Sequence, residues 1–177
     1  VEEFFDQIGM HKKTEYDPKA GKTFLHPGRQ ALISYEGEVM GYLGEVHPAV
    51  ADTYGIGTRA YVAVLDILNV VKHASFDRKY EGVAKFPAMK RDLSMVMKKD
   101  IFVGQLEKIF KDKGGKLLES YELFDVYEGD QIEKGYKSVA YSLTFRAKDR
   151  TLEDAEVSKI VEKILDELKK LGVELRA

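Results

Sequence analysis

No cysteine occurs among the 177 residues, which excludes disulfide bonds, thiolate nucleophiles and zinc sites built on cysteine. The sequence also lacks any apolar run that approaches the roughly 20 residues needed to span a bilayer as a helix. We therefore expect no membrane partner. A chain without thiols is compatible with a reducing cytosol, and a cytoplasmic location is the expectation.

Excess charge of one sign is missing as well. The 28 lysines and arginines nearly balance the 30 aspartates and glutamates, so the formal net charge is −2. Such a chain has no overall field that would attract nucleic acid regardless of sequence, and we expect no DNA partner. Any contact with RNA would have to come from a local patch.

What the chain does contain is the composition of a globular protein. Hydrophobic residues make up 44% and charged residues 33% of the sequence. The length suffices for one large or two small domains. An amphipathic pattern is already under way at Val1, without an initiator methionine, so we interpret the chain as a piece of a longer protein.

The charged, unpatterned stretch "SFDRKYEG" is the best candidate for a domain boundary. It predicts a linker over residues 76–83, between a first domain over 1–75 and a second over 84–177. The patterns of the first domain alternate between short helices and strands. They predict helices over 1–8, 48–54 and 67–72, strands over 30–35, 39–46 and 60–66, and a polar, turn-rich stretch over 11–23.

The second domain has a regular order of elements. Strands are predicted over 91–97, 117–127 and 136–147, and a helix over 103–111. A capping pair, Thr151 and Asp154, precedes a second helical stripe, and "VELR" is a short last strand. This order is typical of a ferredoxin-like split βαβ sandwich, an α+β fold with two helices on one face of an antiparallel sheet.

Only one face of such a sheet is covered, because both helices carry a single apolar stripe. With uninterrupted pleats, the covered side is expected to show Leu93, Met95, Val139, Tyr141, Leu143, Phe145, Val173 and Leu175. We call the other side the open face. It is expected to show Asp92, Ser94, Asp125, Tyr127, Ser138, Ala140, Ser142, Thr144, Glu174 and Arg176.

Small side chains on an open face let a flat ring approach closely. Serine hydroxyls donate or accept hydrogen bonds, and the Asp125 carboxylate can accept from the amino and imino edge of guanine. Tyr127 offers a plane on which a base can stack. The same surface would equally suit packing against another domain, and the residues alone leave both interpretations open.

Other chemistries find less support in the sequence. The run "GKT" from Gly21 matches the end of a phosphate-binding P-loop, but Tyr16 stands where that motif needs a glycine. His26 and His47, with Glu45, are candidate metal ligands, yet both histidines precede a proline and suit turns better. We therefore expect no metal site.

The second domain also lacks the groups for nucleophilic catalysis. The last histidine is His73, so no histidine base is available there, and we expect no catalytic residue. Basic residues do gather near its predicted strand ends, as an ordinary solvated surface or as a patch that follows phosphates. They are Lys85, Lys90, Arg91, Lys134, Lys137, Arg146, Lys148 and Arg150.

Several short motifs keep a specific order and spacing through the second domain. They are Phe86-Pro87, Arg91-Asp92, Phe124-Asp125-Val126-Tyr127 with Gly129, Gly135 with Lys137-Ser138, Arg150-Thr151-Leu152 and Leu175-Arg176. Together they resemble the ferredoxin-fold anticodon-binding domain that ends the β subunit of bacterial phenylalanine–tRNA ligases. Upstream, "HPGRQALI" and "GYLGEVHPAVADTYGI" resemble the end of that subunit's catalytic-like core domain, which has a class II synthetase fold without the active site.

This resemblance implies a partial class II synthetase-like α+β domain followed by an anticodon-binding domain. It also implies binding of phenylalanine tRNA rather than catalysis, because the family places ATP, phenylalanine and the adenylation chemistry in the α subunit. The whole ligase would use ATP and Mg²⁺ and form a heterotetramer with that subunit. The fragment itself would hold no cofactor.

The positions that contact the anticodon in the family correspond to Asp125 and Ser138. The alternation of side chains along the strands also puts these two residues on the open face, without reference to the family. The predicted RNA-binding residues are Asp125, Ser138, Tyr127, Ser142, Arg91 and Lys137. The competing interpretation is a ferredoxin-like small-ligand sensor or dimerisation module that uses the same face.

Overall fold

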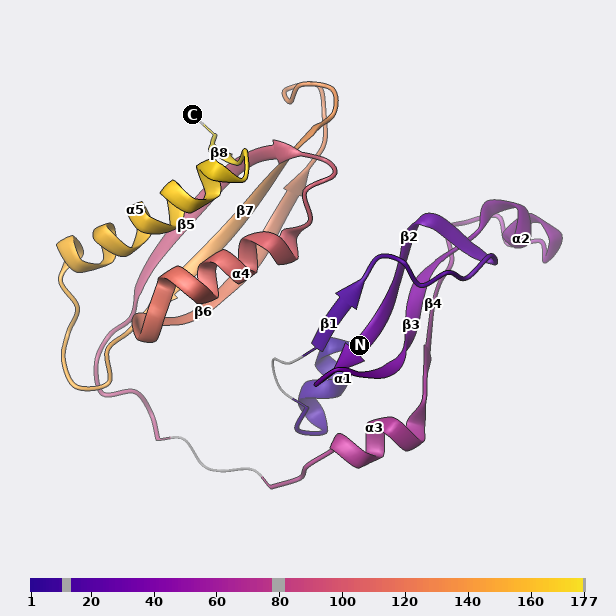
Figure 1. Cartoon of the computed structure of the whole chain (residues 1–177), viewed down its shortest axis with the longest axis horizontal. Helices are drawn as coiled ribbons and strands as arrows, with labels where there is room; N and C mark the ends of the chain where they lie inside the picture. Colours follow the sequence, from indigo (N-terminus) through magenta and orange to yellow (C-terminus); the bar gives the residue numbers. More distant parts are fainter. Residues whose placement is uncertain (11–13, 78–81, 177) are drawn as a thin grey trace. The chain divides into compact units, whose positions relative to one another are not determined.

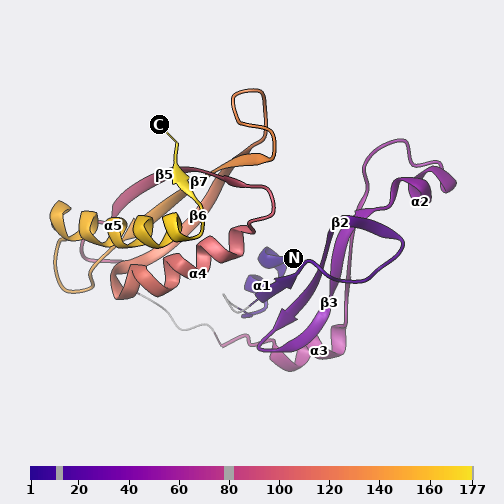
Figure 2. The same cartoon turned by 45° about the horizontal axis from the view of Figure 1, so that its top comes forward.

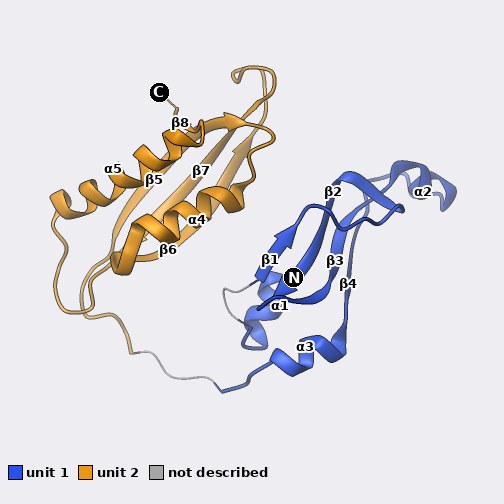
Figure 3. Ribbon diagram, in the orientation of Figure 1, with its two compact units in different colours: residues 1–81 blue, residues 82–177 orange. Residues whose placement is uncertain are grey.

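The structure, a computed structural model, describes residues 1–10, 14–77 and 82–176. The chain forms two compact units that divide between residues 81 and 82 (Figure 3). That division falls within the stretch 76–83 expected as a linker, of which residues 78–81 lie outside the described ranges. Among the described residues, no helix is both long and apolar enough to cross a membrane.

Unit 1, residues 1–81, is built around an antiparallel sheet with the strand order β1-β2-β3-β4 (Figure 1). Its elements are α1 (Glu2–Gln7), β1 (Thr14–Asp17), β2 (Leu25–Tyr35), β3 (Glu38–Val46), α2 (Pro48–Thr53), β4 (Tyr61–Leu65) and α3 (Ile67–His73). The helices α1 and α3 each bury one residue, Phe5 and Val70, in a small core. The other buried members of that core are Met10, Ile33, Tyr35 and Met40.

One strand of unit 1 was not predicted. The expected turn-rich stretch over 11–23 contains β1, which pairs antiparallel with β2 from Thr14 opposite Tyr35 to Asp17 opposite Leu32. β1 is an edge strand and largely exposed, so backbone hydrogen bonds hold it and no apolar alternation marks it in the sequence. Residues 11–13 of that stretch lie outside the described ranges.

Unit 2, residues 82–177, has the ferredoxin-like architecture expected from the sequence. Its antiparallel sheet has the strand order β6-β7-β5-β8, and α4 and α5 lie side by side on one face of it (Figures 1 and 2). The elements are β5 (Met89–Lys98), α4 (Val103–Gly114), a 3₁₀ turn (Gly115–Leu117), β6 (Leu118–Tyr127), β7 (Tyr136–Phe145), α5 (Asp154–Lys170) and β8 (Glu174–Leu175).

The core of unit 2 lies between this sheet and the two helices. β7 contributes Val139, Tyr141, Leu143 and Phe145, all of them fully buried. The Tyr141 hydroxyl donates a hydrogen bond to Glu107 Oε1 of α4 at 2.9 Å, which satisfies a polar group inside the core. Burial raises the pKa of Tyr141. The helices contribute Leu106, Phe110, Val157, Ile164 and Leu168.

A β-bulge decides which side chains of β6 reach the open face. Leu123 lies opposite Tyr141, on the helix side of the sheet. One extra residue, Phe124, follows, and Asp125 lies opposite Ala140. Without that extra residue Leu123 and Asp125 would share a face, because side chains alternate along a strand. The expectation of uninterrupted pleats is therefore wrong for β6, and the bulge turns Asp125 to the open face.

The start of α5 also differs from the sequence-based expectation. The helix begins at Asp154 with Glu153 as its N-cap, rather than with Thr151 as the cap. The Glu153 and Glu156 side chains accept hydrogen bonds from each other's backbone N–H groups. Arg150 donates to both carboxylate oxygens of Glu156, at 2.6 and 2.7 Å, and this pair stabilises the later start.

We expect residues 82–177 to fold without residues 1–81, because the core of unit 2 is drawn from that segment alone. The isolated segment should show one cooperative thermal transition by far-UV circular dichroism. Leu143→Ala in the same segment should lower its free energy of unfolding by about 2–5 kcal/mol, since Leu143 is fully buried. A segment that melts without cooperativity would contradict the division into two units.

Candidate functional site

Four of the six predicted RNA-binding residues lie on the open face of unit 2. Tyr127 lies opposite Ser138, and Asp125 lies opposite Ala140, across the β6–β7 pairing. Ser142 follows Ala140 on the same side of β7. The structure therefore brings Asp125, Tyr127 and Ser138 together and puts Ser142 beside them.

Ser138 is on the open face but is buried there by its neighbours. Its Cα partners across the sheet are Tyr127 of β6 and Val96 of β5. Both neighbours have much larger side chains on the same face, so the serine is only 4% exposed. A ring that hydrogen-bonds the Ser138 hydroxyl therefore has to displace the side chain of Tyr127 or Val96.

The Tyr127 ring already has partners within the protein. The Arg176 guanidinium carbon lies 5.8 Å from the centre of the ring, and Arg176 Nη2 donates to Gln131 Oε1 at 3.0 Å. At Gly129, a Cβ atom would lie 2.3 Å from the Tyr127 hydroxyl oxygen, so only glycine leaves room for the ring in this position. A ligand that stacks on Tyr127 must share the ring with Arg176 or displace it.

The open face is not a strongly basic surface. Carboxylates and cations occur on it in similar numbers, so it has little general attraction for phosphates. Recognition there would depend on specific hydrogen bonds rather than on a broad positive field. The strand pairing puts six charged residues on this face, and the contact with Tyr127 adds Arg176. The six are Asp92, Glu122, Asp125, Glu174, Lys90 and Lys98.

Arg91 and Lys137 do not join this cluster. Their Cα partners across the sheet are buried residues of the core, so both lie on the helix side. Arg91 forms an ion pair with Asp154, the first residue of α5. Lys137 donates to the Lys99 carbonyl oxygen at 3.2 Å, and burial lowers the pKa of its ammonium group. These two cations therefore have structural partners on the opposite side of the sheet.

The cluster suits recognition of a planar polar ring. The exposed Asp125 carboxylate accepts hydrogen bonds, and the Ser138 hydroxyl can donate or accept. Tyr127 and Arg176 offer flat surfaces for stacking. Within the described part of the chain, no three histidine, aspartate or glutamate side chains converge in a way that would hold a metal ion.

Three contributors to this surface were not predicted as site residues. Arg176 was assigned to the open face by alternation, but nothing near it in the sequence indicates that it reaches Tyr127. Val96 lies in the run "MVM", where every position is apolar, and only its even spacing from Ser94 marks its face. Gln131 belongs to the β6–β7 loop, which has no periodic pattern.

The alternative metal ligands in unit 1 have structural partners. His26 Nδ1 accepts a hydrogen bond from the Gly28 N–H, and His47 Nδ1 accepts one from a backbone N–H at the start of α2. Neither histidine is the turn residue that was expected from the sequence, because His26 lies within β2 and His47 is the N-cap of α2. Glu45, which is buried, accepts two hydrogen bonds from Arg29, at 3.0 and 2.8 Å.

Comparison with known proteins accounts for both units. The family model for the ferredoxin-fold anticodon binding domain matches residues 84–176. The family model for the phenylalanyl tRNA synthetase beta chain CLM domain matches residues 1–67. The first match covers more than half of the chain and includes the whole open face, and it does not favour a small-ligand sensor or dimerisation module.

Curated relatives lead to the same family. Phenylalanine–tRNA ligase β subunits from Clostridium acetobutylicum, Clostridium tetani and Bacillus cereus are 42%, 41% and 34% identical to the chain, each over 99% of its length. The chain spans 22% of the length of each relative. With the fold, the open face and the family match in agreement, the chain belongs to the ferredoxin-fold anticodon-binding domain family.

Proposed function

We propose that the chain binds the anticodon stem-loop of phenylalanine tRNA, as the last part of a phenylalanine–tRNA ligase β subunit. The observation that carries the proposal is the cluster of Asp125, Tyr127 and Ser138 on the face of the anticodon-binding domain opposite α4 and α5. The choice of tRNA is supported by the relatives, which are phenylalanine–tRNA ligase subunits.

In this proposal Asp125 and Ser138 recognise one base by its edge. A carboxylate accepts hydrogen bonds from adjacent N–H donors, which guanine presents on its Watson–Crick edge. Because Ser138 is only 4% exposed, the side chain of Tyr127 or Val96 would move aside to admit the edge of such a ring, which Tyr127 and Arg176 would flank. Base contacts of this kind supply specificity, whereas contacts with phosphates position the RNA without reading its sequence.

Catalysis would take place elsewhere in the ligase. The chain corresponds to 22% of the relatives' length, and we infer that it holds neither ATP nor Mg²⁺ itself. An α subunit would supply the adenylation chemistry, and the whole enzyme would be a heterotetramer in the cytoplasm. The role of this chain would be to hold the anticodon end of the tRNA while chemistry proceeds at the other end.

The pure chain should therefore show no phenylalanine-dependent exchange between ATP and pyrophosphate. Mixing it with an α subunit should not create this activity, because the chain corresponds to only 22% of the relatives' length and the rest of the β subunit would be missing. The exchange of radiolabelled pyrophosphate into ATP measures this directly. Phenylalanine-dependent exchange by the chain alone would contradict the assignment of a recognition role.

Asp125→Ala should reduce discrimination between bases more than overall binding. The expected loss is on the order of 1–3 kcal/mol for a missing base-edge pair, and less for Ser138→Ala because a neutral hydroxyl bonds more weakly than a carboxylate. Fluorescence anisotropy would compare a stem-loop with the native anticodon and one with its first base changed. Glu122→Gln, which alters an exposed carboxylate elsewhere on the same face, is the matched control. Equal losses on both RNAs would argue against base recognition.

Adjacent cations on opposite faces provide a test of the phosphate contacts. Lys90 lies opposite Thr144 on the open face, whereas Arg91 lies on the helix side and is paired with Asp154. Lys90→Ala should flatten the slope of log affinity against log salt by roughly 0.7–0.9, the value for one phosphate contact. Arg91→Ala should leave this slope unchanged. A flatter slope for Arg91→Ala would instead support its sequence-based assignment as an RNA-binding residue.

A further inference from the structure

Lys99, the first residue after β5, is joined to the β6–β7 loop, residues 128–135, and to the strand that follows it. Its backbone N–H donates to the Gly135 carbonyl oxygen at 2.9 Å, and its Nζ lies 2.6 Å from Glu128 Oε2. Its carbonyl oxygen accepts a hydrogen bond from Lys137 Nζ at 3.2 Å. One residue thus holds both ends of the loop through all three of its polar groups. We call these three contacts the Lys99 latch.

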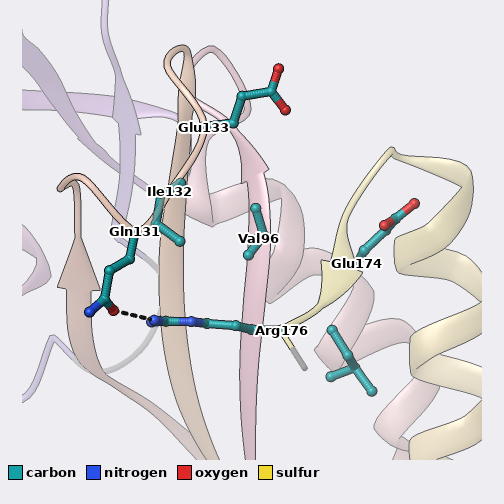
Figure 4. Close-up of a pocket in the computed structure, with 7 residues that line it drawn as sticks. Val96, Gln131, Ile132, Glu133, Glu174 and Arg176 are labelled. Atoms are coloured by element: carbon teal, nitrogen blue, oxygen red, sulfur yellow. Dashed lines mark hydrogen bonds between the residues drawn. The ribbon is translucent and has the colours of Figure 1, made fainter.

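The β6–β7 loop has little packing of its own to keep it in place. Its residues, 128–135, all lie within the described ranges, and each is exposed or half-buried. A segment with few buried contacts opens at a low cost in free energy, so its polar links decide how well it is ordered. A further link comes from the end of the chain, where Arg176 Nη2 donates to Gln131 Oε1 at 3.0 Å (Figure 4).

The loop in turn fixes the ring of Tyr127. A Cβ atom at Gly129 would lie 2.3 Å from the Tyr127 hydroxyl oxygen, so the loop backbone lies directly against the end of the ring. Arg176, which the loop holds through Gln131, has its guanidinium carbon 5.8 Å from the centre of the same ring. The position of the loop therefore decides where the flat surface beside Asp125 stands.

The charges around the Lys99 latch suit a structural contact better than a phosphate site. Partial burial lowers the pKa of Lys137, and the carboxylates of Glu128 and Asp100 act in the opposite direction. Glu128 also forms the ion pair with Lys99. The two ammonium groups therefore share two nearby carboxylates, which leaves little positive charge to attract a phosphate.

We propose that Lys99 is a positioning residue for anticodon recognition. It contacts no RNA itself and keeps the β6–β7 loop in the arrangement in which Tyr127 and Arg176 stand ready for a base. This proposal rests on the proposed function. A loop that is ordered before binding loses little conformational entropy on binding. When only a fraction of the molecules has the loop in place, the apparent affinity for every RNA that needs it falls by that fraction.

Two variants of the full chain with opposite changes in charge test the latch by fluorescence anisotropy. Lys99→Met and Glu128→Gln break the same ion pair, but the first removes a positive charge and the second a negative one. Each should weaken binding of the native anticodon stem-loop about threefold, the size of one exposed ion pair. If Lys99 acted on the RNA by its charge, Glu128→Gln would strengthen binding, and that result would overturn the proposal. Lys163→Met, an exposed change on α5, should have no effect.

The same variants separate positioning from direct contact. Lys99→Met should weaken binding of the stem-loop with a changed first anticodon base by the same factor, and it should leave the salt slope unchanged. A flatter slope would show a phosphate contact, and a loss confined to the native anticodon would show a base contact; either would overturn the proposal. In a Tyr127→Ala background, Lys99→Met should cost little more, because the latch acts through that ring. Additive losses would also overturn it.

Amide hydrogen exchange of the free chain, followed by NMR, tests the latch without RNA. The Ile132 N–H donates to the Gly129 carbonyl oxygen at 2.9 Å, so its exchange rate reports how often the loop opens. Lys99→Met and Glu128→Gln should raise this rate about threefold and leave exchange at the buried Leu143 of β7 unchanged. Unchanged exchange at Ile132 would overturn the latch and leave the proposed function intact. Faster exchange at Ile132 in the variants of a chain that binds no stem-loop would overturn the proposed function, and with it the role of Lys99 in recognition.

Discussion

The pairing of β7 with both of its neighbours is the constraint on which unit 2 depends. β7 pairs along its length with β5 on one side and β6 on the other. Its odd-numbered residues, from Val139 to Phe145, fill the core, and its even-numbered residues, from Ser138 to Thr144, form the middle of the open face. A shift of one residue would exchange these two sets. The hydrophobic core therefore holds the open face in register, and the core and the proposed base site share one strand.

β6 has to satisfy two requirements that a regular strand cannot meet together. Tyr121 packs against the core, where its ring lies 5.8 Å from that of Phe110, whereas Asp125 lies on the open face. Both have odd numbers, so a continuous pleat would put them on the same side. The extra residue at Phe124 resolves the conflict. The same irregular strand end then leads into the loop where Gly129 makes room for the Tyr127 ring.

Periodic patterns predicted the elements of unit 2 and the four residues that share its open face. They could not predict contacts made by chain segments that lack a period. The β6–β7 loop and the last residues of the chain meet only in three dimensions, so the link from Arg176 to Gln131 leaves no local signal. Likewise, proximity in the sequence to strand ends suggested Arg91 and Lys137 as RNA contacts, whereas alternation places both on the helix side. In unit 1, β1 was missed because an exposed edge strand needs no apolar residues.

The two sheets also differ at their edges. β6, the last strand of its sheet, is interrupted by two register shifts, which distort the row of backbone groups that another chain would need for pairing. β4, the last strand of the other sheet, pairs with β3 without a shift and exposes Tyr61, Val62 and Val64. Of these two edges, β4 is therefore the one at which we expect strand-to-strand association to begin in a concentrated solution.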